Sequence, residues 1–144
     1  MARAALALLA FASSAFAAQA ASAPLVAGAP ILLARAQSLT ECRRLVPDYT
    51  ALCTLASFAD GQMEIGRQDI NRDGHLDLVV RRQSSLQCGS HGCSTEVYFR
   101  RHGKYVRGDP PLISAGPIYR CRTSKSFGLQ MTTGSGRGPC IEIK

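Results

Sequence analysis

The residues best suited to chemistry lie in one short stretch, DINRDGHLDL, which runs from residue 69 to residue 78. Oxygen-bearing side chains occupy its first, third, fifth and ninth positions, at Asp69, Asn71, Asp73 and Asp77, and the glycine at the sixth position permits a sharp turn. Calcium prefers about six to eight hard oxygen ligands. Three carboxylates this close together repel one another without a cation, so the spacing predicts a calcium loop.

Two observations keep other interpretations of this stretch open. An EF-hand places a bidentate Glu at position 12, but that position is Val80, and a strand pattern follows where an EF-hand has a helix. The residues Asn-Arg-Asp-Gly also form a strong turn sequence, whose Asx side chains cap turns without any metal. The alternatives to calcium are therefore a metal-free Asx-rich turn or, less expected, another ion.

Residues 64–80 resemble the calcium loop D-x-[DN]-x-D-G-x-x-D-[LI] of FG-GAP/VCBS-type β-repeats, in which the loop leads directly into an apolar strand. The resemblance implies calcium, held by the side chains of Asp69, Asn71, Asp73 and Asp77 and by the backbone carbonyl of His75. One copy of the repeat cannot build a propeller. The segment C-G-S-H-G-C at residues 88–93 also resembles a C-G-x-G-G-C hairpin of small exported bacterial proteins, which implies the same compartment and fold class.

The N-terminus has the pattern of a secretory signal peptide, with a positive start, an apolar run and an A-x-A site at residues 15–17. We expect a signal peptide of residues 1–17, with cleavage after residue 20 as the alternative. Residues 18–37 are rich in Ala and Pro and are expected to form a flexible leader, followed by a single β-rich domain at residues 38–144. The mature protein is then expected to be periplasmic or secreted and not transmembrane.

The cysteine count is even, which in a short exported chain predicts a disulfide framework. The six cysteines are Cys42, Cys53, Cys88, Cys93, Cys121 and Cys140. Local spacing suggests the pairs 42–53, 88–93 and 121–140, although fifteen pairings are possible for six cysteines. His91 lies between two cysteines, so a zinc site is the alternative there, but no C-x-x-C partner accompanies it.

Periodicity predicts a mostly β, small α+β fold of antiparallel hairpins, joined by disulfides into a single domain. Ser38 and Glu41 fit the capping-box pattern S-x-x-E, which predicts a short N-terminal helix ending before Pro47. Alternating apolar residues at 76–80 predict a strand directly after the acidic loop. The Gly-rich stretch at 133–139 lacks the G-K-[ST] of a phosphate loop and is expected to be a hairpin turn.

Charge is divided unevenly along a chain whose formal net charge is +7. Five acidic residues lie between residues 60 and 77, whereas residues 81–144 hold eleven Lys and Arg but three acids. Three basic groups, at 81–82, 100–107 and 120–125, would form one positive face if their strands were neighbours. Such a face favours an anionic envelope polymer or another exported protein as partner, and the thin aromatic content disfavours nucleic acid.

No catalytic set of residues can be singled out, so we expect a non-enzymatic exported module whose calcium loop is structural and whose role is binding at the cell envelope. One alternative is an inhibitor-type interaction protein that acts on a secreted hydrolase. A further alternative is a small hydrolase, which would need a cleft holding an acid or a histidine with a perturbed pKa.

Overall fold

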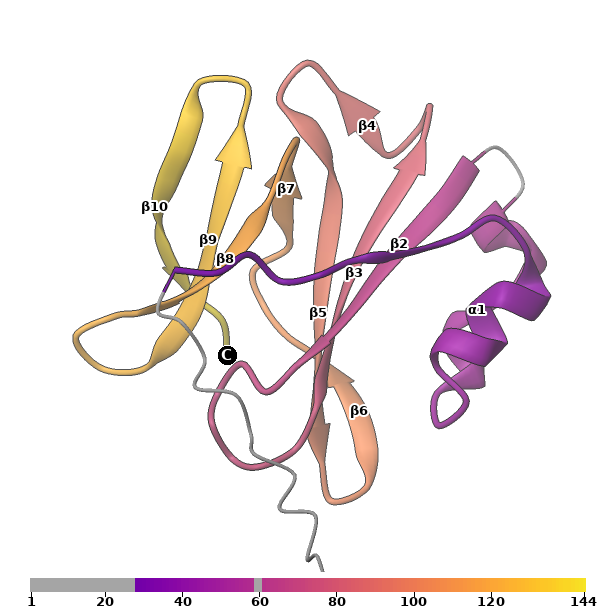
Figure 1. The fold of residues 1–144 in the computed structure, drawn as a ribbon, viewed down its shortest axis with the longest axis horizontal. Helices are drawn as coiled ribbons and strands as arrows, with labels where there is room; N and C mark the ends of the chain where they lie inside the picture. Colours follow the sequence, from indigo (N-terminus) through magenta and orange to yellow (C-terminus); the bar gives the residue numbers. More distant parts are fainter. Residues whose placement is uncertain (1–27, 59–60) are drawn as a thin grey trace, which may run out of the picture.

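The computed structural model describes residues 28–58 and 61–144, so the predicted signal peptide at 1–17 lies outside the described residues. Strands make up most of the secondary structure, and one short α-helix and two 3-10 helices lie near the start (Figure 1). In chain order the elements are β1 (Ala34–Ala36), α1 (Leu39–Leu45), η1 (Thr50–Leu52), η2 (Leu55–Phe58), β2 (Gly61–Gln68), β3 (Asp77–Ser84), β4 (Cys88–Gly89), β5 (Gly92–Arg101), β6 (Lys104–Arg107), β7 (Leu112–Ser114), β8 (Ile118–Arg122), β9 (Phe127–Thr133) and β10 (Gly136–Glu142). The predicted mostly β fold with antiparallel sheets and a short helix is confirmed.

Within the described residues, seven strands form an antiparallel sheet in the order β1-β2-β3-β5-β4, and β6 and β7 also pair with β5. The hairpin of β2 and β3 is in continuous register from Gly61 opposite Ser84 to Gln68 opposite Asp77. Residues 69–76, which hold most of the acidic stretch, are therefore the connection of this hairpin. The fold places the loop at one end of the two central strands.

A three-stranded antiparallel sheet, ordered β10-β9-β8, covers one face of the larger sheet (Figure 1). Ala115 and Gly116, between β7 and β8, both donate to the carbonyl of Thr132 on β9 and so join the two sheets. Apolar side chains from both sheets form a core between them, which includes Val79, Val97, Phe99, Ile118, Leu129 and Met131.

The helical segment covers the opposite face, so the larger sheet is the middle of three layers. Because successive residues of a strand point to opposite faces, Val79 packs towards the small sheet while Leu78 and Val80 pack with Val46 and Leu52 of the helical layer. This arrangement explains why β3 begins with four consecutive buried residues.

Helix α1 begins as the capping-box pattern predicts, and its cap is well defined. The Ser38 hydroxyl accepts from the backbone N–H of Glu41 at 3.3 Å. The Glu41 carboxylate accepts from the N–H of Gln37 at 2.7 Å, one residue earlier than in the standard box. The two bonds fix the direction in which the chain enters the helix.

The described part of the predicted flexible leader is packed, which corrects the expectation for residues 28–37. Strand β1 pairs with β2, and Ile31 donates its N–H to the carbonyl of Ile118 on β8 at 2.7 Å. Gly66 on β2 makes room for this segment, because a Cβ there would lie 2.9 Å from Ile31 and 2.7 Å from Leu33. The ordered domain therefore includes residues ahead of 38, and we call residues 28–36 the N-terminal strap.

The six cysteines form the three local pairs that spacing suggested. Cys42–Cys53 joins α1 to the end of η1 inside the core beneath the helical layer. Cys88–Cys93 closes the β4–β5 hairpin, and no free cysteine is left for a metal. Cys121–Cys140 connects β8 to β10 across the central strand β9 of the small sheet.

Removing the longest-range disulfide is expected to destabilise the protein most. Its cysteines are 19 residues apart, against 5 for Cys88–Cys93, and cross-link stabilisation in the chain-entropy model grows with loop length. We expect the Cys121→Ala/Cys140→Ala variant to lose about 3 kcal/mol of unfolding free energy, and Cys88→Ala/Cys93→Ala about 2 kcal/mol. Urea unfolding measures both, and a larger loss for the 88–93 variant would contradict this ranking.

Candidate functional site

A buried carboxylate anchors the acidic loop. Asp77 is the first residue of β3 and its side chain has no solvent exposure. Its Oδ2 accepts from the backbone N–H of Ile70 at 2.9 Å, and its Oδ1 accepts from the backbone N–H of Arg100 at 3.0 Å. One side chain therefore holds the start of the loop against β3 and the end of β5.

The electrostatics of Asp77 set it apart from an ordinary surface carboxylate. Burial raises its pKa, and the nearby negative charges of Asp73 and Asp69 raise it further, whereas the N–H groups of Arg100 and Ile70 lower it. The net shift is upward. A negative charge here is costly to hold, and a cation within the loop would reduce that cost.

The remaining loop carboxylates and the Asn71 amide are turned inward onto the loop's own backbone. Asp69 accepts from the N–H groups of Asp73 at 3.2 Å and Gly74 at 3.0 Å. Asn71 Oδ1 accepts from the N–H of Asp73 at 3.1 Å, and Asp73 Oδ1 accepts from the N–H of His75 at 2.8 Å. Although partial desolvation of Asp73 opposes its ionisation, the bonds from His75 and Asn71 lower its pKa.

These contacts bear on how well the loop fits calcium. Among the described residues, no group of three or more His, Cys, Asp and Glu side chains lies close enough together to hold a metal ion. The predicted ligands Asp69, Asn71, Asp73, His75 and Asp77 do share one loop, and a carboxylate keeps lone pairs beyond those used by an N–H. The donor chemistry fits calcium, but the Asn71 amide, which donates to Asp73 Oδ2 at 2.9 Å, would have to turn.

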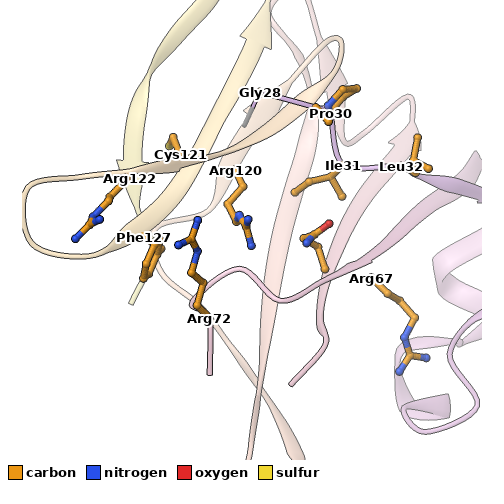
Figure 2. A pocket seen from close by; sticks show the side chains of 12 residues that line it. Gly28, Pro30, Ile31, Leu32, Arg67, Arg72, Arg120, Cys121, Arg122 and Phe127 are labelled. Carbon is orange, nitrogen blue, oxygen red and sulfur yellow. The ribbon is translucent and has the colours of Figure 1, made fainter. Parts of the chain in front are cut away.

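The loop also forms one wall of a cavity of about 520 Å³ that sequence reasoning did not identify (Figure 2). The strap and the β8–β9 hairpin form the other walls. The lining residues are Gly28, Ala29, Pro30, Ile31, Leu32, Arg67, Gln68, Arg72, Arg120, Cys121, Arg122 and Phe127. Four arginines and no acidic residue are among them.

The basic groups expected to form one face are divided by the fold. Arg81 and Arg82 lie on β3 and pair with Glu64 and Glu96, whereas the 120–125 group lies on the other sheet. The cavity instead joins Arg120 and Arg122 with Arg72 of the acidic loop. The sequence gives a weak indication of this cluster, because Arg120 and Arg122 are two residues apart and residues at that spacing on a strand share a face.

The chain has no match among protein-family models, curated proteins or solved structures. The likeness of residues 64–80 to an FG-GAP calcium loop therefore stays a prediction.

Substituting Asp77 is expected to destabilise the fold far more than substituting its exposed neighbour Asp73. Asp77→Ala leaves the N–H groups of Ile70 and Arg100 without their acceptor, at about 1–3 kcal/mol for each unsatisfied group. We expect a loss of roughly 2–5 kcal/mol for Asp77→Ala, against about 1 kcal/mol or less for Asp73→Ala. Chemical denaturation of the two variants tests this, and equal stabilities would show that the buried carboxylate does not anchor the loop.

Proposed function

We propose that this protein is an exported, non-enzymatic binding or structural module, in which the loop at residues 69–77 holds a calcium ion. The three disulfides support an oxidising, exported environment, in agreement with a periplasmic or secreted location. Among the described residues, no helix has the length and apolar character required to cross a bilayer.

The observation that carries the calcium proposal is the buried Asp77, whose pKa is raised by burial and by two further carboxylates of the same loop. The nine residues that follow Gln68, from 69 to 77, hold three carboxylates, and the last of them, Asp77, pairs with Gln68 in the β2–β3 ladder. Calcium supplies positive charge to such a site without requiring a buried basic side chain. Asp69, Asn71, Asp73 and Asp77 would provide side-chain oxygens, and His75 its carbonyl.

In this proposal the ion is structural. Asp77 is committed to two backbone N–H groups, so it is a poor candidate for accepting a proton from a substrate. A bound ion would stiffen the loop and so fix Arg72, which projects from its middle towards the cavity (Figure 2). The binding role at the cell envelope would then belong to the surfaces that the loop positions.

The inhibitor-type alternative has one observation in its favour. The β4–β5 hairpin is closed by the Cys88–Cys93 disulfide, and Leu86 beside it is 88% exposed. A constrained hairpin next to an exposed apolar side chain suits insertion into a partner's cleft, because little conformational entropy is lost on binding. Copurification of a secreted hydrolase with the wild-type protein, lost on Leu86→Asp, would favour this role.

Calcium binding can be tested by thermal unfolding of the mature, oxidised protein in calcium and in EGTA. If the dissociation constant is about 1 mM, as for weak extracellular modules, 10 mM calcium should add about 1.4 kcal/mol. For a domain of this size that shift corresponds to a Tm increase of about 5 °C. Isothermal titration calorimetry on the same sample should give one site.

The matched variants are Asp73→Ala in the loop and Asp109→Ala outside it, since both remove one exposed carboxylate. We expect the calcium-dependent Tm shift to disappear in the first and to remain in the second. Identical unfolding of the wild-type protein in calcium and in EGTA would contradict the proposal and identify the loop as a metal-free Asx-rich turn.

A further inference from the structure

The cavity between the N-terminal strap, the acidic loop and the β8–β9 hairpin has the charge of an anion site. Arg67, one of its four lining arginines, is neutralised by Asp48, which it contacts through two hydrogen bonds of 3.0 and 2.8 Å. In the part of the chain that the structure describes, the other three, Arg72, Arg120 and Arg122, form no ion pair, whereas Arg35, Arg81, Arg82, Arg100 and Arg107 each do. The cavity therefore collects uncompensated positive charge.

Two of these arginines are held around one aromatic ring. The guanidinium carbon of Arg72 lies 5.0 Å from the ring centroid of Phe127, and that of Arg122 lies 5.9 Å from it. Phe127 lies directly opposite Arg122 in the β8–β9 ladder. Figure 2 shows the ring between the two side chains. Cation–π contacts leave the in-plane N–H donors of both guanidinium groups free for a ligand.

The third arginine is oriented by the backbone of the acidic loop. Arg120 Nη1 donates to the backbone carbonyl of Asp69 at 2.8 Å, whereas the Asp69 carboxylate accepts from the loop's own N–H groups. This contact uses one of five guanidinium donors and does not cancel the charge. Figure 2 shows Arg120 and Arg72 extending into the same space.

The strap gives the cavity an apolar side. Pro30, Ile31 and Leu32 line it together with Phe127, and Leu32 is 85% exposed. A volume of about 520 Å³ falls within the usual range for small-molecule sites. A bare inorganic anion would satisfy the arginines but leave this apolar wall in contact with water.

We propose that this cavity binds a phosphate monoester that carries an apolar group. The planar fork of arginine matches a phosphate with two parallel hydrogen bonds, and three unpaired arginines suit a group with nearly two negative charges. The phosphate would lie between Arg72 and Arg120, and its apolar group would pack on the strap. Arg122, on the other side of the Phe127 ring, would add positive charge without contacting the phosphate. The site is separate from the calcium loop's oxygen ligands, although Arg72 connects the two.

The experiment uses the mature, oxidised protein in EGTA, so that its result does not depend on calcium. Hexyl phosphate is titrated by calorimetry, with inorganic phosphate and hexanol as comparison ligands. We expect hexyl phosphate to bind at least tenfold more tightly than either. Equal binding of inorganic phosphate and hexyl phosphate would overturn the apolar half of the proposal, and no binding of hexyl phosphate would overturn all of it.

Variants then locate the site. Arg122 and Arg72 are exposed, and among the described residues neither side chain forms a hydrogen bond. The variants Arg122→Gln and Arg72→Gln should therefore fold, and thermal unfolding checks that they do. Arg72→Gln should weaken hexyl phosphate binding about tenfold, and Arg122→Gln, which removes charge from the other side of the Phe127 ring, should weaken it less. The matched control Arg44→Gln removes an exposed arginine of α1 that does not line the cavity, and it should bind as the wild type does. Affinity that is unchanged in both cavity variants would overturn the proposal.

A second arm distinguishes a lipid from a soluble phosphate as the source of the ligand. The protein is mixed with phosphatidylcholine vesicles that contain phosphatidic acid and with vesicles of phosphatidylcholine alone. Binding to the first alone, lost in Arg72→Gln, supports a lipid headgroup, and hexyl phosphate binding without vesicle binding supports a soluble ligand. Vesicle binding that Arg122→Gln and Arg72→Gln leave unchanged would reflect general surface charge and would rule out a lipid headgroup as the source.

Discussion

The buried carboxylate of Asp77 determines how the acidic loop packs against the strands that follow it. It accepts hydrogen bonds from two backbone N–H groups. Asp77 joins Ile70 in the loop to Arg100 on β5, and the side chain of Ile70 is itself buried in the core between the two sheets. Since the loop's direction follows from this anchor, so do the position of Arg72 and the carbonyl of Asp69 that receives Arg120. The two functional proposals therefore depend on the same buried group, one through its charge and the other through its geometry.

Local patterns were sufficient to predict much of the fold. Ser38 and Glu41 mark the start of α1, the alternation after residue 76 marks β3, and short cysteine separations correspond to the three bridges. The sequence does not predict the packing of the strap, because no hydrophobic periodicity occurs within it. The strap is held by partners far along the chain, Ile118 and the strand β2. Local sequence patterns do not reveal such long-range contacts.

For the candidate site too, the sequence predicts the local features but not those that depend on long-range contacts. The oxygen ligands of the acidic loop follow from spacing within nine residues, so the sequence alone predicts their proximity. Their hydrogen-bonding directions do not follow, because they depend on how the loop closes on Asp77. The cavity could not be predicted from the sequence. Its lining residues Leu32, Arg72, Arg120 and Phe127 come from three separate segments that meet only in the folded chain.

The strap has a consequence for the order in which the molecule assembles. Its contacts with β8 join residues that lie far apart in the chain, Ile31 with Ile118 and Pro30 with Tyr119. Contacts of such long range form late, because the entropy of closing the intervening loop must be met first. The strap would thus be among the last segments to become structured, so the cavity whose wall it forms would be completed only after both sheets have formed.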